Sequence, residues 1–217
     1  MKKLLLLLFI FLSFHVFAQQ PNCEEVPELI HQAKIKLQED ASSSEARKYL
    51  RIALESEPMN EEVNYLLAKS HLNDAPSHYV LNYINKALAS NPNKIAYRWI
   101  RVQTLMAEMK MLSGIRTELV DQALEDLNFL IAQESEPGKA YLLKGSLYNQ
   151  LGDDFQYKRT DQANEEMIFY KTAINYYKDA LDSVKMAVNL NESNSNKIDT
   201  RAIEFKISKI NDKISQL

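Results

Sequence analysis

The sequence is poor in the residues that build disulfide-rich or β-sheet proteins. Its 217 residues include one cysteine, four glycines and six prolines. A single cysteine excludes an internal disulfide, so the fold must be held together by its core. There is no Asn-Gly or Asp-Gly pair and no run of alternating β-branched residues, which argues against β-hairpins. Alanine, leucine, lysine and glutamate dominate instead, and this composition predicts an all-α fold.

The chain also lacks an excess of positive charge. Its formal net charge is −3, and removing Lys2 and Lys3 leaves −5. Proteins that bind nucleic acid carry a basic surplus on some face, so we expect no nucleic-acid partner. Apart from its first residues, the sequence has no long apolar run, so we expect no transmembrane span in the mature chain.

The N-terminus resembles an export signal. Lys2 and Lys3 precede an apolar run from Leu4 to Phe14, which is shorter than the roughly 20 residues that span a bilayer. We predict a signal peptide over residues 1–18, cleaved after Ala18, with an uncleaved anchor as the alternative. The mature chain is then periplasmic or secreted and begins with a flexible tail over 19–26.

Cys23 raises the question of a lipid anchor, because a lipoprotein signal also places a cysteine after its apolar run. That processing requires small residues immediately before the cysteine. Pro21 and Asn22 do not fit this requirement. Lipid anchoring at Cys23 is therefore not expected.

Two stretches of sequence repeat the same spacing 34 residues apart. Ala46-x3-Leu50-x2-Ala53-x4-Pro58 matches Val80-x3-Ile84-x2-Ala87-x4-Pro92 at every point. Each stretch has helical spacing and then a proline, which cannot continue a helix. Val63, Leu67, Ala68 and His71 mark another amphipathic helix between them. The unit is therefore a helix, a short turn, a second helix and a stop.

A third stretch carries the clearest resemblance to a known family. Tyr141, Gly145, Tyr148, Leu151 and Gly152 resemble the first-helix pattern of the tetratricopeptide repeat (TPR) family, whose period is 34 residues. The resemblance implies a right-handed α-solenoid of about four helical hairpins. It implies that Gly145, like Ala68 in an earlier unit, faces the second helix of its own unit. Gly152 is expected to end the helix in a left-handed conformation.

The repeats divide the mature chain. We predict one helical repeat domain over 27–217, with repeats at about 27–60, 61–94, 95–137 and 138–191 and a cap at 197–217. The first helix of the third repeat is expected to be long, from Ile95 to about Leu112, where Ser113-Gly114 breaks it. The third repeat ends at Pro137, two residues later than expected.

The last third of the chain departs from the repeat pattern. Residues 153–161 are polar and are expected to be irregular, whereas 162–191 reads as one long helix. The final helix, from Lys197 to about Ile214, has charged residues over much of its surface. We interpret it as a capping helix whose outer face tolerates water. The residues expected to form its apolar positions are Ile198, Ala202, Phe205, Ile207, Ile210 and Ile214.

No catalytic motif is present in the sequence. It contains no HExxH, CxxC, P-loop or G-x-G-x-x-G pattern. His71 occupies a position typical of a core aromatic, and a metal site shared with His78 is the alternative. We predict that the chain is not an enzyme and holds no metal or cofactor. An enzyme or ligand carrier that uses residues 153–161 is the alternative.

Stacked first helices of such a solenoid line a concave groove, where a partner binds. The residues expected there are Tyr65, Lys69, Trp99, Gln103, Met106, Leu142, Ser146 and Asn149. The exact period places Arg98 and Arg101 in core positions. A shift of one residue instead buries Trp99, Val102 and Met106, and this alternative stays open. Arg98 and Arg101 then face the groove or solvent, where they pair with a carboxylate of a bound peptide.

Aromatic residues crowd the predicted long helix. Tyr170 and Tyr177 lie on its apolar stripe, together with small and aliphatic residues. Phe169 and Tyr176 point in other directions, because neighbours on a helix are about 100° apart. They form either part of a partner surface or extra core against the polar segment.

These patterns lead to one functional expectation and two alternatives. The TPR resemblance implies a non-catalytic scaffold that docks a peptide or partner helix, and export places it in the cell envelope. A homo-oligomer assembled through the long helix is the first alternative. An accessory subunit of an envelope assembly or secretion complex is the second.

Overall fold

The computed structural model describes residues 25–111, 117–158, 160–190 and 198–216. This part of the chain is all-α, without a strand, as predicted. The predicted signal peptide, Cys23 and the predicted break at Ser113-Gly114 lie outside the described residues. The helices are α2 (Val26–Glu39), α3 (Ser44–Ser56), α4 (Glu61–His71), α5 (Ser77–Ser90), α6 (Ile95–Met111), α7 (Thr117–Ala132), α8 (Pro137–Gln156), α9 (Ala163–Asn189) and α10 (Thr200–Ile214).

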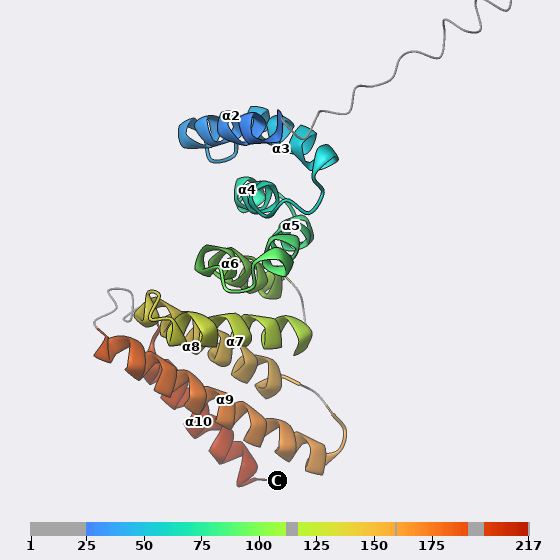
Figure 1. The fold of residues 1–217 in the computed structure, drawn as a ribbon. Helices are drawn as coiled ribbons and strands as arrows, with labels where there is room; N and C mark the ends of the chain where they lie inside the picture. Colours follow the sequence, from blue (N-terminus) through green and yellow to red (C-terminus); the bar gives the residue numbers. More distant parts are fainter. Residues whose placement is uncertain (1–24, 112–116, 159, 191–197, 217) are drawn as a thin grey trace, which may run out of the picture.

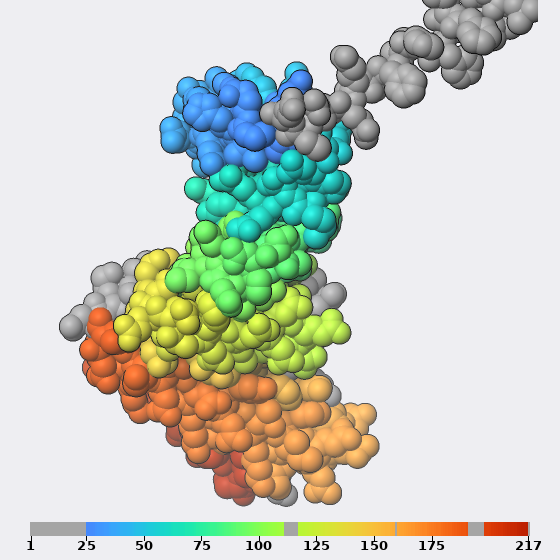
Figure 2. Space-filling view, in the orientation of Figure 1, coloured from blue at the N-terminus to red at the C-terminus, as the bar shows by residue number. Residues whose placement is uncertain are grey.

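Consecutive helices pair into four hairpins, which stack in chain order from α2 at one end to α10 at the other (Figure 1). The hairpins are α2–α3, α4–α5, α6–α7 and α8–α9, and α10 packs against α9. The result is an elongated body, narrower at α4–α6 than at α8–α10 (Figure 2). The predicted array of four hairpins with a long helix and a C-terminal capping helix is confirmed.

The hairpins begin and end where the local sequence requires. Ser43 and Asn60 are the N-caps of α3 and α4, and their side chains accept hydrogen bonds from the backbone N–H groups of the first turns. Pro58 and Pro92 follow the ends of α3 and α5, as predicted. Pro137 acts at the opposite end of a helix, since it begins α8, where its missing N–H costs no hydrogen bond.

The apolar core runs without a break along the stack. Tyr65 and Tyr83 contact both the cluster built on α2–α4 and the cluster built on α4–α6. Leu81 joins the latter to the cluster of α6–α8, and Tyr148 joins that one to α9 and α10. Four small residues of the predicted repeat pattern are fully buried in these clusters and allow close helix packing. They are Ala46, Ala53, Ala68 and Ala87.

Gly145 lies where the sequence predicts, at the contact with the second helix of its own hairpin. A Cβ atom added there would lie 2.9 Å from Val184 Cγ2 and 3.2 Å from the Ala180 carbonyl oxygen, both on α9. Real Cβ atoms essentially never approach other atoms within 3.0 Å. The glycine therefore allows α8 to pack closely on α9. This close packing explains why a glycine occupies a helix interior despite its cost in helix stability.

The prediction that Gly152 ends its helix is wrong. α8 continues to Gln156, and Gly152 is buried within it without a left-handed backbone. A Cβ atom there would lie 2.5 Å from Cε1 of Tyr177. The glycine makes room for this aromatic ring from α9. Because α8 extends to Gln156, the first residues of the 153–161 segment are helical rather than irregular.

The apolar positions of α10 also differ from the prediction. Ala202 and Phe205 are exposed, with 60% of Phe205 accessible, whereas Ile203 and Ile210 are buried against α9. Ile207 and Ile214 lie half-buried beside them. The buried stripe therefore includes Ile203 at helical spacing from Ile207 and Ile210. The helix still caps the stack, with Phe205 on its outer face.

Candidate functional site

The first candidate site is a pocket between the N-terminal turns of α4 and α6, the first helices of the second and third hairpins. Its volume is about 490 Å³. The residues that line it are Asn60, Glu61, Glu62, Tyr65, Lys94, Ala96 and Tyr97. Of the groove residues expected from the sequence, this pocket contains Tyr65. The 34-residue period places residues 62 and 96 at equivalent positions, a signal that could have identified the pocket in advance.

Glu61 is held in place by two neutral donors. The hydroxyl of Tyr97 donates a hydrogen bond of 2.7 Å to its Oε1 atom, and the amide of Asn91 donates one of 3.2 Å to the same atom. Among the described residues no cation pairs with Glu61. Glu62 differs, because Lys34 of α2 lies 2.6 Å from its Oε1 atom. The pocket thus contains one carboxylate with a cation and one without.

Two tyrosine rings form the inner wall of this pocket. The ring centroids of Tyr65 and Tyr97 are 4.7 Å apart with a tilt of 33°. Tyr97 is buried and Tyr65 half-buried. Burial raises the pKa of the Tyr97 hydroxyl well above its ordinary value, and its hydrogen bond to Glu61 raises it further. Burial also raises the pKa of Tyr65. Both hydroxyls therefore stay neutral, and the wall can supply π faces to a ligand.

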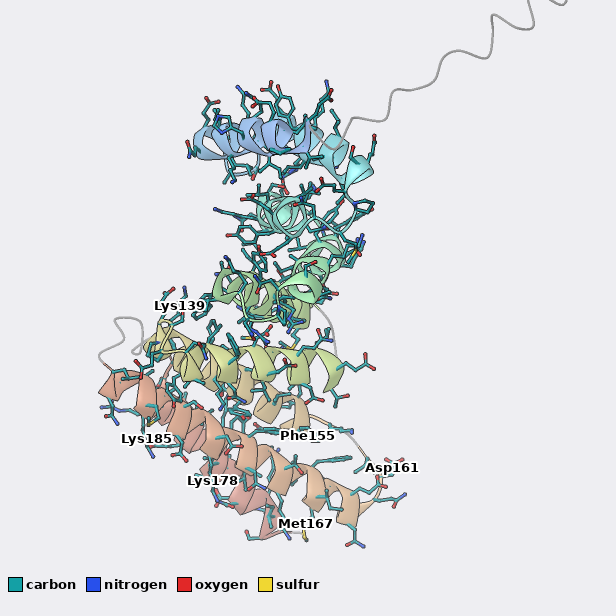
Figure 3. All side chains as sticks on the ribbon, in the orientation of Figure 1. Lys139, Phe155, Asp161, Met167, Lys178 and Lys185 are labelled. Carbon is teal, nitrogen blue, oxygen red and sulfur yellow. The ribbon has the colours of Figure 1, made fainter. Side chains whose placement is uncertain are left out.

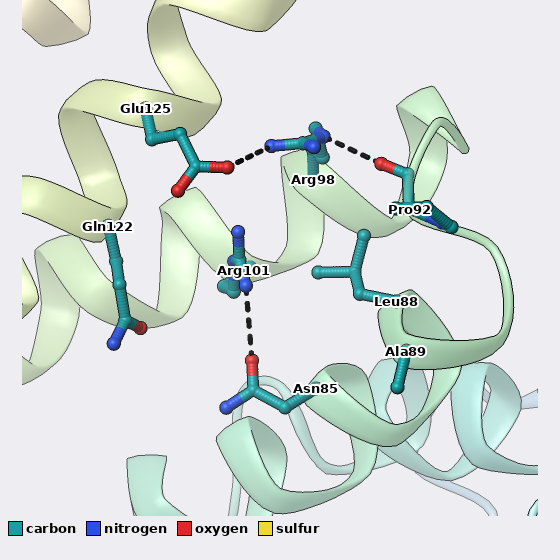
Figure 4. A pocket seen from close by; sticks show the side chains of 8 residues that line it. All are labelled: Asn85, Leu88, Ala89, Pro92, Arg98, Arg101, Gln122 and Glu125. Atoms are coloured by element: carbon teal, nitrogen blue, oxygen red, sulfur yellow. Dashed lines mark hydrogen bonds and ion pairs between the residues drawn. The ribbon is translucent and has the colours of Figure 1, made fainter.

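A second pocket, of about 380 Å³, lies between α5, α6 and α7 (Figure 4). Arg98 and Arg101 of α6 line it, opposite Gln122 and Glu125 of α7. α5 supplies the remaining wall, including Asn85, which accepts a hydrogen bond from Arg101. Two of its three walls are second helices, and the third is the first helix α6.

The two arginines of this pocket already have a carboxylate partner inside the protein. Arg98 Nη1 lies 2.6 Å from Oδ1 of Asp126, and Arg101 Nε lies 2.6 Å from Oδ2 of the same carboxylate. Asp126 has no exposed side-chain surface. Arg98 also donates to the carbonyl of Pro92 and pairs with Glu125 (Figure 4). The expectation that Arg98 and Arg101 face the groove or solvent is corrected, because Asp126 holds both at the α5–α7 side.

The environment of Arg101 explains why a buried cation is stable there. Burial alone would lower the pKa of its guanidinium, but the hydrogen bond and charge of Asp126 raise it more, and Glu125 adds to the effect. Arg98 lies 4.2 Å from the ring centroid of Phe129, in cation–π contact. Sequence reasoning missed Asp126, although it lies four residues from Gln122 and three from Ala123 on a face shared by core and polar positions.

The structure decides the register of α6. Trp99, Val102 and Met106 are buried, as the one-residue shift predicts, and they belong to the core cluster of α6–α8. The expectation that Trp99 and Met106 line the groove is therefore wrong. The indole of Trp99 donates to Ser135, and the ammonium of Lys139 lies 4.3 Å from the ring centroid.

The remaining groove residues differ in exposure. Lys69 and Gln103 are exposed, whereas Leu142, Ser146 and Asn149 of α8 are half-buried. Asn149 accepts a hydrogen bond of 3.2 Å from Lys206, so α10 reaches this part of α8. Leu142, Ser146 and Asn149 do not belong to either pocket.

The aromatic residues of α9 pack against the end of α8. The ring of Phe155 lies 5.5 Å from Tyr176 and 6.4 Å from Phe169, measured between centroids. Figure 3 shows Phe155 at the end of α8 opposite to Lys139. Phe169 and Tyr176 are half-buried, and the ammonium of Lys158 lies 4.5 Å from the Phe169 ring centroid. These contacts favour the reading of extra core over an open partner surface.

Neither a metal site nor a membrane span is found in the part of the chain that the structure describes. No group of three or more His, Cys, Asp or Glu residues there could hold a metal ion. None of the described helices is both long and apolar enough to cross a membrane. His71 is mostly buried, at 12% side-chain exposure, and its ring stacks on that of Tyr83.

Comparisons with known proteins leave the family open. No family model matches the chain, and no curated protein matches it. One solved structure, described as the MamA RS-1 ArsTM double mutant, has a TM-score of 0.49 and 14% sequence identity to this chain. The match covers 87% of this chain and 96% of that one. A likeness at this level carries no argument, so membership of the TPR family and the handedness of the stack stay predictions.

Proposed function

We propose that this chain is a non-catalytic protein-interaction module, which docks a peptide or a partner helix on the face formed by its first helices. The observation that carries the proposal is the pocket between α4 and α6. It lies in the middle of an elongated stack of hairpins rather than inside a closed bundle (Figure 1), so an extended ligand can cross several hairpins.

The chemistry of the pocket supports recognition of a polypeptide. Its walls combine two tyrosines with two carboxylates, an amide and an ammonium. Aromatic residues are enriched at protein interfaces, and polar groups around them fix the orientation of a partner. Exposed Lys69, one turn beyond Tyr65 on α4, can extend such a contact along the helix.

A selection from a displayed peptide library tests this proposal. We expect the purified chain to enrich a family of related peptides, and the Tyr65→Ala variant to bind them at least about tenfold more weakly, since a central aromatic often dominates an interface. Tyr79→Ala is the matched control, because Tyr79 is an exposed tyrosine of the neighbouring helix α5, outside both pockets. If no peptides are enriched, or if both variants bind as the parent does, the proposal is wrong.

A second candidate function is a structural homo-oligomer assembled through α9. Ile168, Met186 and Val188 of this helix are exposed, at 59%, 42% and 49%. Apolar side chains of this size favour burial in an interface. Light scattering over a range of concentrations tests the candidate. A dimer that the Met186→Lys variant dissociates supports it, whereas a monomer at the highest concentration rules it out.

We also propose that the protein acts in the cell envelope, where it serves as a scaffold or as an accessory subunit of an assembly. The support is the N-terminal pattern of two lysines and an apolar run. Mass spectrometry of the exported protein tests this location. A mature N-terminus at Gln19 is expected, and a chain retained in the cytoplasm with Met1 or Lys2 at its start contradicts it.

A further inference from the structure

We infer that the pocket between α4 and α6 binds a lysine or arginine side chain of the docked partner, with Glu61 and the paired rings of Tyr65 and Tyr97 as its binding groups. This inference rests on the proposed function, because it assumes a polypeptide ligand. It goes further by naming the chemistry of the ligand at one position.

Glu61 is the central group because it is preorganised and has no cation of its own among the described residues. Its Oε1 atom accepts from Tyr97 and Asn91, both neutral. Its Oε2 atom accepts no hydrogen bond from a described residue. The side chain is half-buried, so a cation placed beside it is screened less than on an open surface. A carboxylate held in this way pairs with an incoming ammonium or guanidinium at little entropic cost.

The two tyrosine rings suit the rest of a basic side chain. Lysine and arginine bury their methylene stems along apolar surface and keep their charged heads in polar surroundings. Tyr65 and Tyr97 provide such a surface directly beside Glu61, with ring centroids 4.7 Å apart. A cation within about 6 Å of a ring centroid also gains attraction from the ring. A neutral aliphatic side chain would use the stem contacts but not the charge.

The chain itself provides a precedent on the rim of this pocket. Lys34, from the first helix of the preceding hairpin, places its ammonium 2.6 Å from Glu62. Both side chains of this pair are about half exposed, at 45% and 48%. The lysine of one element thus already binds an α4 carboxylate across the stack. Glu61, next in sequence and less exposed than Glu62, offers the same chemistry to a partner.

Lys94 is the group that opposes a cationic ligand. It lines the pocket, and its positive charge repels a second cation. It is exposed at the end of a flexible side chain and forms no ion pair with a described residue, so it can move away from an incoming ligand. Replacing Lys94 should therefore change the affinity for a basic side chain in the opposite direction to replacing Glu61. Lys94→Gln should strengthen binding of a basic side chain.

The α5–α7 pocket is a weaker candidate for a charged ligand. Its two arginines are matched by the buried carboxylate of Asp126 and by Glu125 at the rim. An anion that entered it would have to displace Glu125. Within the described residues, the α4–α6 pocket has no such internal counter-ion on Glu61, which is why we place the charged contact there.

Two small probes test the inference without knowledge of the partner. They are N-acetyl-lysine methylamide and its neutral analogue N-acetyl-norleucine methylamide, titrated into the isotope-labelled chain and followed by backbone amide NMR. We expect signals of residues 60–66 and 94–98 to shift with the lysine compound and to shift much less with the norleucine compound. Equal shifts with both compounds, or no shifts in these segments, would overturn the inference.

Variants assign the effect to the named groups. Glu61→Gln keeps the acceptor for Tyr97 but removes the charge, and we expect it to weaken lysine binding about fivefold. Glu118→Gln is the matched control, because Glu118 also lies in the first turn of a helix but outside both pockets. Lys94→Gln should strengthen binding. If the Glu61→Gln variant is folded and binds the lysine compound with the affinity of the parent, the inference is overturned.

The peptide selection separates this inference from the proposed function. Enriched peptides that share a lysine or arginine, and that lose affinity for the Glu61→Gln variant, support both. Enriched peptides without a shared basic residue support a docking module but overturn the basic-side-chain pocket. If no peptide is enriched, the proposed function fails, and the NMR titration still decides whether the pocket takes a basic side chain.

Discussion

Arg98 donates a hydrogen bond of 2.6 Å to Asp126, a carboxylate on the neighbouring helix that has no exposed side-chain surface. Arg101, one turn further along α6, binds both oxygens of the same carboxylate, at 2.6 and 2.8 Å. One buried anion thus ties two cations of α6 to α7. This arrangement joins the two helices of the third hairpin through charge as well as through apolar packing.

Asp126→Ala should destabilise the protein strongly. It leaves two poorly exposed guanidiniums without their shared anion, and breaking a buried pair in this way costs about 3–5 kcal/mol. The free energy of unfolding in urea measures the loss. Glu125→Ala is the neighbouring control, because Glu125 is 65% exposed and its pair with Arg98 should contribute less than about 1 kcal/mol. Similar losses in both variants would show that Asp126 is not the anchor.

The repeat architecture could be predicted from the sequence because short-range rules determine it. The Ala46 and Val80 stretches share one spacing, and Pro58 and Pro92 end their helices as expected. Gly145 was placed correctly because a helix interior tolerates glycine mainly where another helix approaches closely. Each of these inferences depends on neighbours within one hairpin.

The errors arose where a distant partner decides the outcome. Gly152 lies in a Leu-Gly pair typical of a turn, yet α8 continues past it and the ring of Tyr177 on α9 packs against it. Arg98 and Arg101 read as groove residues because the sequence does not show that Asp126, 28 and 25 positions away, lies beside them. In α10, Ile203 rather than Phe205 packs against α9. The sequence alone does not show which of these nearby apolar residues contacts the neighbouring helix.

The candidate site was less predictable than the fold. Tyr65 was expected on the groove from its repeat position, but Glu61 and Tyr97 were not singled out. Their hydrogen bond joins residues 36 positions apart, in two successive first helices. Such contacts depend on how one hairpin stacks on the next, and the period alone does not give the rotation between them.

Gly152→Ala should destabilise the protein, although glycine to alanine usually stabilises a helix interior. The added methyl group would lie 2.5 Å from the Tyr177 ring, whose hydroxyl donates hydrogen bonds to Asp153 and Gln156. Overpacking of this kind costs about 1–3 kcal/mol, more than the roughly 1 kcal/mol gained in helix propensity. Thermal and urea unfolding measure the difference.

A Tyr177→Leu background provides the control for this overpacking. The smaller side chain leaves room for the added methyl group, so the same glycine replacement should become neutral or stabilising. An equal cost in both backgrounds would place the strain elsewhere than at the Tyr177 ring.

Lys206→Met should loosen α10 without unfolding the rest of the stack. The Lys206 ammonium lies 2.6 Å from Oδ1 of Asp153 and 3.2 Å from Oδ1 of Asn149, and it is a charged contact of α10 with α8. Methionine keeps the apolar stem but removes these hydrogen bonds. Because the pair is about one-third exposed, we expect a loss of only about 1 kcal/mol, seen as faster amide exchange within α10.

Lys209→Met is the control for α10, since Lys209 lies over the exposed ring of Phe205 on the outer face. Its exchange rates should match those of the parent protein. Uniform acceleration through all helices in Lys206→Met would mean that α10 does not open separately.

His71 should make the protein less stable as the solution becomes mildly acidic. Burial lowers the pKa of its imidazole below the ordinary 6.5, and the charge of Arg47 on α3 lowers it further. Asp74 acts in the opposite direction, and Arg51 adds to the lowering. As the pH falls below 6.5, the unfolded chain takes up the proton before the folded chain does. The stability present above this pH is then progressively lost.

The pH profile of the His71→Gln variant isolates this contribution. We expect its free energy of unfolding to change less between about pH 8 and about pH 5.5 than that of the parent, because the group that titrates there is absent. His78→Gln, which removes an exposed imidazole from α5, should follow the parent profile. Carboxylates away from His71, such as Asp154, whose pKa burial raises, are present in all three proteins and cancel in the comparison. A His71→Gln profile parallel to that of the parent would mean that the folded protein binds a proton at His71 as readily as the unfolded chain does.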